Sequence, residues 1–165
     1  MTSQANPLQP LNGSDVDRHY YFMQEALLMA QSAAQDNEVP VGAVLVQDDV
    51  IIARAHNAPI QLNDPTAHAE IQCFRAAGSA KKNYRLVNCS LYVTLEPCMM
   101  CVGAIIHARI EQLIFGAYDL RAGAVISQYE GLNQSFHNHR LKVTGGIFAQ
   151  ESQILLKNFF KVRRS

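Results

Sequence analysis

The sequence predicts an α/β fold in which helices cover a central mixed β-sheet, and two features of its apolar pattern support this prediction. Segments with apolar residues every three or four positions, as in amphipathic helices, alternate with short apolar runs typical of buried strands. The runs at residues 90–95 and 112–117 are separated by a helix-length segment instead of a tight turn. Strands joined in this way pair in parallel through a crossover connection. The 165 residues, 48% of them hydrophobic, suit a single domain with one core.

The chain begins with a polar segment that is followed by a long amphipathic helix. Residues 1–13 are expected to form a flexible tail. They have neither the basic start nor the apolar run of a secretory signal, so a signal peptide is not the expected alternative. Residues 14–165 are expected to form the single domain. A helix is predicted from Asp15 to about Asn37, with Ser14 or Asp15 as its N-cap residue. Five residues at helical spacing form its predicted inward face: Phe22, Ala26, Met29, Ala30 and Ala33.

A hairpin and a second helix are predicted next. Val39-Pro40 ends the first helix, and two short apolar runs follow at residues 41–46 and 50–55. The polar stretch between these runs gives them the outline of a hairpin. A loop at residues 57–66, which contains two prolines, leads into a helix expected at residues 68–80. Asp64 or Thr66 is its expected cap.

The second half of the chain continues the alternation of strands and helices. After the strand at residues 90–95, a helix is expected from Pro97 to about Ala108, because proline suits the first helical position. The strand at residues 112–117 follows. Residues 118–139 are rich in glycine and polar residues, so we expect loops around a short helix. An edge strand at 141–147 and a helix at 150–161 are predicted last, the helix with an inward face of Ile154, Leu155 and Phe159.

Three residues from the two central helices have the chemistry of zinc ligands. Cys98 and Cys101 are three positions apart, so on a helix both sulfur atoms lie on one face. In the opening turn of the predicted helix, the helix dipole favours the thiolate form of both side chains. His68 adds an imidazole from the start of the preceding helix. Two thiolates and one imidazole suit one tetrahedral Zn²⁺ ion per chain and leave the fourth position to water, as in catalytic zinc sites.

Glu70 has a separate predicted role. Residues two apart on a helix point to different sides, so Glu70 is poorly placed to bind the same ion as His68. We expect its carboxylate to reach the water on that ion and to move protons. A histidine followed two positions later by a glutamate, with a distant Pro-Cys-x-x-Cys, is the signature of the zinc nucleobase deaminases.

Composition limits the partners and the compartment of the protein. Fourteen Lys and Arg residues balance fourteen Asp and Glu residues, which argues against a general nucleic-acid binder. Beyond residue 139 six basic residues face one acid, Glu151, so this end is locally basic and suits phosphate contacts. No apolar run approaches the roughly 18 residues of a membrane span. Four cysteines, two of them assigned to metal, favour a reducing cytoplasm over a disulfide framework.

The residues around the expected ligands resemble one family, the bacterial tRNA-specific adenosine deaminases. The resemblance runs from about residue 18 to residue 164, and it is specific because the flanking strings belong to this branch of the cytidine deaminase-like enzymes. The strings that carry it are Val39-Pro40-Val41-Gly42-Ala43-Val44, Asn57, Asp64-Pro65-Thr66-Ala67-His68-Ala69-Glu70, Asn83-Tyr84-Arg85-Leu86, Thr94-Leu95-Glu96-Pro97-Cys98-Met99-Met100-Cys101 and Asn138-His139-Arg140. An N-terminal extension and the stretch from Leu120 to His137 depart from the family pattern.

The resemblance implies a three-layer α/β/α sandwich of the cytidine deaminase type, with a central mixed sheet of about five strands. It also implies a homodimer that converts the wobble adenosine of an arginine tRNA anticodon to inosine, with the tRNA anticodon stem-loop as partner. His68, Cys98 and Cys101 then correspond to the zinc ligands and Glu70 to the catalytic proton shuttle. Asn57 corresponds to the base-binding asparagine of the family.

Four further residues are candidates for RNA contacts, each with an alternative role. Asp119 is placed to accept a ribose 2′-hydroxyl, or only to cap a turn before Leu120. Phe160 is a candidate for stacking on an anticodon base, or a core residue. Arg163 and Arg164 suit phosphate contacts, or form a solvated face.

Two other functions stay open at the level of sequence. The metal motif also fits a deaminase of a free base or nucleoside such as guanine, cytosine or cytidine, and only the flanking strings and the basic C-terminal residues argue against it. A non-catalytic, zinc-containing RNA-binding subunit is the other alternative. Such a subunit would have no use for Glu70.

Overall fold

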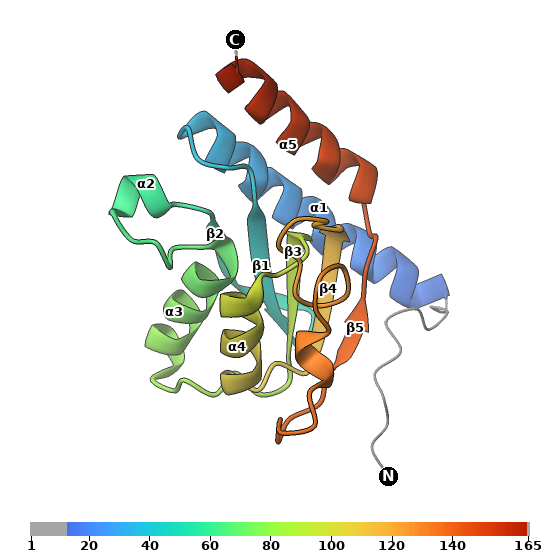
Figure 1. The fold of residues 1–165 in the computed structure, drawn as a ribbon. Coiled ribbons are helices and arrows are strands. Elements are labelled where there is room, and N and C mark those ends of the chain that lie inside the picture. The colour runs from blue at the N-terminus through green and yellow to red at the C-terminus, as the bar shows by residue number, and fades with distance from the viewer. Residues whose placement is uncertain (1–12, 165) are drawn as a thin grey trace.

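The computed structural model describes residues 13–164, so the predicted tail at residues 1–13 lies outside the described residues except for Gly13. The elements in chain order are α1 (Gly13–Gln35), β1 (Gly42–Gln47), β2 (Val50–His56), α2 (Pro59–Leu62), α3 (Ala69–Lys81), β3 (Cys89–Leu95), α4 (Met99–His107), β4 (Gln112–Ala117), the 3₁₀ helix η1 (Gly131–Asn133), β5 (Lys142–Thr144) and α5 (Ala149–Arg164). Helices α1 and α5 cover one face of the sheet, and α3 and α4 cover the other (Figure 1). This confirms the predicted three-layer α/β/α sandwich.

The five strands form one mixed sheet in the order β2-β1-β3-β4-β5. Strand β1 pairs antiparallel with β2 and with β3, whereas β3, β4 and β5 are parallel. The predicted hairpin and the predicted crossover are both confirmed. Because β3 and β4 are parallel neighbours, the residues that follow them meet at one edge of the sheet. There the N–H of Glu96 donates a hydrogen bond to the carbonyl of Ala117 at 2.8 Å.

Side chains on each strand alternate between two apolar layers. On β1, Ala43 and Leu45 face the layer that contains α3 and α4, while Val44 and Val46 face α1. Both faces of the strands carry apolar side chains because helices cover both sides of the sheet. Gly42 allows the close approach of α1, since a Cβ atom at this position would lie 2.1 Å from the carbonyl oxygen of Ala26.

Three helix starts differ from the prediction, and the first two are those of α1 and α3. Ser14 and Asp15 lie inside the first turn of α1, so neither is its N-cap residue. Helix α3 has His68 as its N-cap residue, and not Asp64 or Thr66. Asp64 instead accepts hydrogen bonds from the N–H and hydroxyl of Thr66, which forms a turn in front of the helix.

Helix α4 also begins later than predicted. Cys98 is its N-cap residue, with φ −79° and ψ 177°, so Pro97 precedes the helix instead of occupying its first position. An extended N-cap residue accepts the first helical hydrogen bond through its carbonyl, and here Cys98 accepts from the N–H of Val102 at 2.9 Å.

The remaining differences concern the loops and the ends of elements. The predicted loop at residues 57–66 contains the short helix α2, and β5 is only three residues long. On α1, Met23 is buried whereas Met29 is partly exposed. On α5, Ile154 is 48% exposed and does not face inward as predicted, whereas Ser152 and Phe159 are buried. None of the helices between residues 13 and 164 is long and apolar enough to cross a membrane.

Candidate metal centre

Helices α3 and α4 both begin with a residue that has a metal-binding side chain. His68 is the N-cap residue of α3 and Cys98 is the N-cap residue of α4, and both have extended backbone conformations. The side chain of an N-cap residue turns back toward the third helical residue. In α4 that third residue is Cys101, so the two sulfur atoms approach each other at the start of the helix. Neither N-cap side chain is used in a capping hydrogen bond, which leaves both available as ligands.

The three donor atoms have the spacing of a zinc site. The Nδ1 atom of His68 lies 3.6 Å from the sulfur of Cys98 and 3.6 Å from the sulfur of Cys101. All three donor atoms lie within 4.8 Å of one another. Tetrahedral zinc, with Zn–N of about 2.05 Å and Zn–S of about 2.3 Å, separates nitrogen from sulfur by roughly 3.6 Å. The donor set and its geometry therefore fit Zn²⁺.

The pKa values of the three donor groups depend on one another. A hydrogen bond from the Cys101 thiol, with a further one from His68, lowers the pKa of Cys98 to about 4. The same shared hydrogen bond, together with burial, raises the pKa of Cys101. The hydrogen bond with Cys98 also raises the pKa of His68. Because zinc binds cysteine as the thiolate, a bound zinc ion would release any proton on these sulfur atoms to solvent.

Glu70 is the second residue of α3 and lies near the two cysteines. It is only 4% exposed, and burial raises its pKa to about 7. The imidazole of His68 and the thiol of Cys101 lower this pKa, but burial outweighs both. A carboxyl group with a pKa near neutrality can both accept and return a proton. The structure thus brings Glu70 to the three donor atoms as a group suited to proton transfer.

Asn57, at the end of β2, lies close to the start of α3 in space. Its N–H donates to the carbonyl of Val41 at 3.0 Å. The N–H of Ala58 donates to the carbonyl of Ala67 at 2.9 Å, which ties the residue after Asn57 to the residue before His68. The Asn57 side chain is 8% exposed, and its amide makes no hydrogen bond with any residue between 13 and 164. The amide therefore keeps a donor and an acceptor for a ligand.

Two buried carboxylates near the centre were not predicted from the sequence. Glu38 is almost fully buried and accepts the N–H of Gln61 at 2.6 Å, which holds α2 in place. Glu96, two residues before Cys98, is 2% exposed and accepts hydrogen bonds from the segment at residues 119–127. Burial raises the pKa of Glu96, but the hydrogen bonds from Ser127 and its neighbours outweigh burial, so the pKa lies below its ordinary value. The sequence signals for Glu96 were its position directly after a buried strand and its place in the string at residues 94–101 that carries the family resemblance.

Asp119 has the turn-forming role that the sequence left open beside ribose binding. Its Oδ1 atom accepts the N–H groups of Arg121 at 3.0 Å and Ala122 at 3.2 Å. Its own N–H donates to Oε2 of Glu96 at 3.0 Å. Asp119 therefore lies at the same edge of the sheet as the candidate metal ligand Cys98, and one of its side-chain oxygens is used in a turn.

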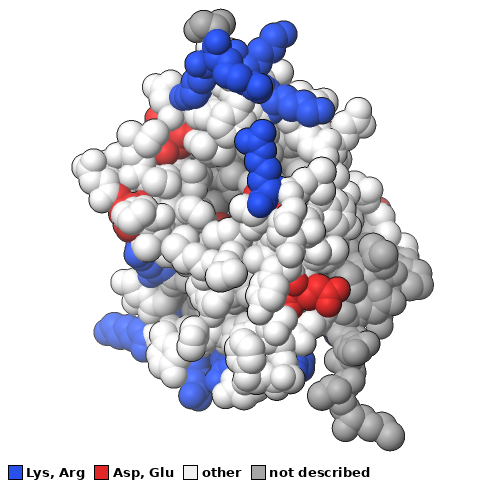
Figure 2. Space-filling view, viewed as in Figure 1, with Lys and Arg blue, Asp and Glu red and all other residues white. Residues whose placement is uncertain are grey.

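The candidate RNA-contacting residues of α5 differ in their exposure and in the contacts that they make within the protein. Phe160 is 43% exposed, and Arg164 is exposed with a hydrogen bond to the Phe160 carbonyl at 3.4 Å. The guanidinium of Arg163 lies 3.4 Å from the centre of the Phe159 ring and donates to the carbonyl of Asn37 at 3.1 Å. Arg163 thus links the end of α5 to the end of α1. Lysines and arginines gather over this end of α5 (Figure 2).

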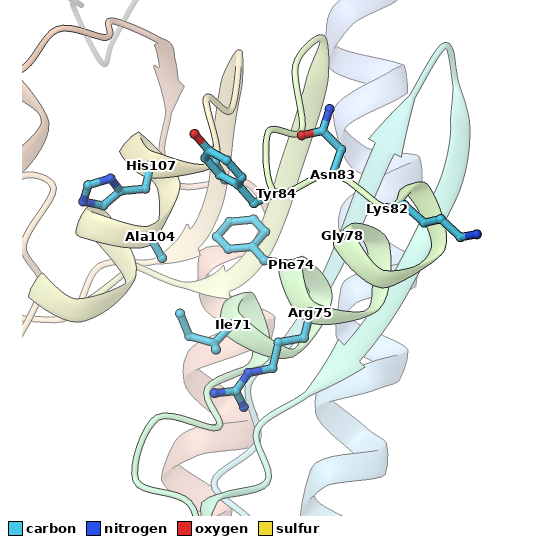
Figure 3. A pocket seen from close by; sticks show the side chains of 10 residues that line it. Ile71, Phe74, Arg75, Gly78, Lys82, Asn83, Tyr84, Ala104 and His107 are labelled. Atoms are coloured by element: carbon cyan, nitrogen blue, oxygen red, sulfur yellow. The ribbon is translucent and has the colours of Figure 1, made fainter.

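A groove of about 530 Å³ lies on the outer face of α3 and α4. The ring of Phe74 and the exposed ring of Tyr84 lie side by side in it, with His107 of α4 at its edge (Figure 3). None of the three metal-binding residues lines this groove, so it is a surface separate from the metal centre.

Comparisons with known proteins agree with this geometry. The sequence model described as "Cytidine and deoxycytidylate deaminase zinc-binding region" matches residues 16–117. The tRNA-specific adenosine deaminase of Haemophilus influenzae is 48% identical over 144 residues, which cover 87% of this chain and 83% of that protein. The tRNA-specific adenosine deaminase of Agrobacterium fabrum is 46% identical over 144 residues, which cover 87% of this chain and 95% of that protein.

Solved structures show the same relationship. A structure from biochemical and structural studies of A-to-I editing by tRNA:A34 deaminases at the wobble position of transfer RNA is 47% identical, with a TM-score of 0.80. The match covers 82% of this chain and 99% of that chain. A guanine deaminase from Nitrosomonas europaea has a TM-score of 0.71 at 20% identity. The match covers 96% of this chain and 97% of that chain. The second similarity concerns the fold alone.

Proposed function

The chain belongs to the cytidine and deoxycytidylate deaminase zinc-binding family, and from that premise we propose that it hydrolyses the wobble adenosine of a tRNA anticodon to inosine. The observation that supports this most strongly is the cluster of His68, Cys98 and Cys101 with Glu70 beside it. This cluster occurs in a chain that is 48% and 46% identical to two tRNA-specific adenosine deaminases. We further propose an arginine tRNA as the substrate, bound through its anticodon stem-loop.

His68, Cys98 and Cys101 are the residues proposed to hold one zinc ion per chain. When bound, zinc lowers the pKa of water from near 16 toward about 7 and so supplies hydroxide at neutral pH. The protein contributes the donor spacing described above and a wall that excludes bulk water, since Cys101 and Glu70 are both buried.

Glu70 is proposed to carry both protons of the reaction. Its carboxylate accepts a proton from water as the new C–O bond forms at C6 of adenine, and passes that proton to ring nitrogen N1. The second O–H proton then moves through Glu70 to the amino group as the C6–N bond breaks. Adenosine and water thus become inosine and ammonia, and the carboxylate is regenerated.

The remaining candidate residues are proposed to place the RNA. The free donor and acceptor of Asn57 suit the edge of the base, which must be unstacked to reach a buried centre. Asp119 is proposed to contact the ribose, and Phe160 to stack on a neighbouring base. Arg163 and Arg164 are proposed to contact phosphates at the end of α5.

The assembly and compartment are also proposals. We propose a single zinc-dependent deaminase domain at residues 14–165, working as a homodimer in the cytoplasm. The four free cysteines suit a reducing compartment. The homodimer rests on the family resemblance, and the apolar groove on α3 and α4 is a surface that a second copy could cover.

The experiment that tests the proposal compares substrates with the zinc-loaded full chain. An arginine tRNA anticodon stem-loop is expected to yield inosine and ammonia far faster than free adenosine, because the flanking nucleotides contribute binding energy. A stem-loop with guanosine at the wobble position is the matched control and should yield no ammonia. Equal rates on the stem-loop and free adenosine, or faster release of ammonia from free guanine or cytidine, would contradict the tRNA assignment.

A further inference from the structure

Glu96 is a buried carboxylate that the proposed chemistry does not use. It directly follows β3 and lies two residues before the expected ligand Cys98. Its backbone and its side chain make separate sets of contacts. The backbone N–H donates to the carbonyl of Ala117, which joins the two parallel strands. Among residues 13–164, the hydrogen-bond partners of the carboxylate all lie in the segment at residues 119–127.

The contacts of the carboxylate resemble an anion-binding loop. Its Oε1 atom accepts three successive N–H groups, those of Val125 at 3.2 Å, Ile126 at 2.7 Å and Ser127 at 2.9 Å. Its Oε2 atom accepts the N–H of Asp119 at 3.0 Å and the hydroxyl of Ser127. Successive N–H groups that point to one concavity form a strong site for a negative charge. The loop is therefore folded around this side chain.

Two further contacts fix the loop against the metal centre. The N–H of Ala124 donates to the carbonyl of Pro97 at 2.9 Å, directly before Cys98. At Gly123, a Cβ atom would lie 2.4 Å from the carboxylate of Glu96, so the backbone can approach this closely only at a glycine. The loop thus borders the region in front of Cys98.

We propose that Glu96 is a positioning residue whose carboxylate holds the loop at residues 119–127 as one wall of the nucleoside-binding site. This inference rests on the proposed function. Because the backbone of Glu96 is anchored to β4 and the carbonyl of Cys98 begins α4, the ligands keep their places when the carboxylate is lost. The loop, including Asp119 at its start, loses its anchor.

The test uses the zinc-loaded full chain with Glu96→Gln, which keeps the shape of the side chain but turns an NH₂ group toward N–H donors. We expect one zinc per chain, a KM for the anticodon stem-loop that rises about tenfold, and a kcat that changes by less than about threefold. Amide exchange at Ile126 and Ser127 should become about tenfold faster or more. Glu130→Gln is the matched control, because Glu130 is an exposed acid in the same stretch, and it should change none of these quantities.

A milder variant keeps the test decisive if Glu96→Gln does not fold. Ser127→Ala removes one hydrogen bond to Oε2 and should raise KM by about threefold at unchanged zinc content. Unchanged KM and unchanged amide exchange in a folded variant would overturn the inference, as would loss of zinc at unchanged KM. If the wild-type chain forms no inosine, the proposed function fails, while amide exchange still decides whether Glu96 anchors the loop.

Discussion

Cys98 combines two roles, because it is both the N-cap residue of α4 and an expected metal ligand. The spacing of Cys98 and Cys101 was sufficient to predict that their sulfur atoms converge. The position of the helix start was not predictable to the residue, because proline suits the first helical position but does not by itself fix where the helix begins. In the structure the extended backbone of Cys98 directs its sulfur toward His68, at a distance of 3.6 Å from Nδ1.

This geometry leads to a prediction for the metal content. Cys98→Ser should lower bound zinc from one ion per chain to about a tenth of that value after dialysis, because a serine hydroxyl is a poor zinc ligand at neutral pH. Metal analysis of the purified protein measures this. Cys89→Ser is the control, since Cys89 is a buried cysteine outside the cluster, and it should keep its zinc. One zinc per chain in Cys98→Ser would exclude this ligand set.

A second residue-scale prediction concerns the turn that leads to His68. Hydrogen bonds from Thr66, and after them from Arg75, lower the pKa of Asp64 to about 2. The ionised carboxyl therefore stabilises the fold fully above its ordinary pKa of 3.8, and this contribution is lost as the pH falls through about 2. In an NMR titration, Thr66→Val should raise the pKa of Asp64 more than Arg75→Gln does. The reverse order would show that the ion pair dominates.

Buried polar groups were the part of the site that sequence reasoning missed. Asn57 and the metal ligands could be predicted, because family strings or ligand spacing mark them. The burial and the partners of Glu38 and Glu96 could not be predicted, although Glu96 lies in a family string, because a buried carboxylate is stable only where distant N–H groups surround it. The partners of Glu96 lie 23 to 31 residues away in the sequence. No local pattern records such a contact.

At the scale of elements, apolar periodicity predicted the long helices and the buried strands, but not the loops or the short pieces. The face of α5 was wrong at Ile154, because alternatives one position apart fit the same periodicity and only packing against α1 and β4 decides between them. Strand β5 is only three residues long, and it is followed by Gly145, where a Cβ atom would lie 2.5 Å from the ring of Phe115.

The packing of α1 against β1 gives a prediction for stability. Gly42→Ala should destabilise the fold by about 3 kcal/mol, because its new methyl group would overlap the backbone of α1 at Ala26 and Ala30. Urea unfolding of both proteins measures the difference. Gly103→Ala is the matched control, because no atom lies within 4 Å of a Cβ there and the residue is inside α4. It should stabilise by about 0.5 to 1 kcal/mol through helix propensity. Equal stability of Gly42→Ala and the wild type would contradict the observed packing.

At the scale of the whole molecule, the sheet explains why residues far apart in sequence form one centre. The parallel pairing of β3 with β4 was predicted from the crossover, and it brings Glu96 and Asp119 to one edge. The antiparallel pairing of β1 with β3 was not predictable, since strand order depends on long-range contacts. That pairing places the end of β2, with Asn57, on the same side as His68.

The central claim is that a metal held by His68, Cys98 and Cys101 works together with the Glu70 carboxylate to deaminate an anticodon adenosine. The most direct measurement is inosine formation on an arginine tRNA stem-loop by zinc-loaded wild type and Glu70→Gln, with the zinc content of both determined. We predict one zinc per chain in both proteins and a rate at least about 10³-fold lower in Glu70→Gln, because the amide cannot move the protons. Similar rates of the two zinc-loaded proteins would contradict the account.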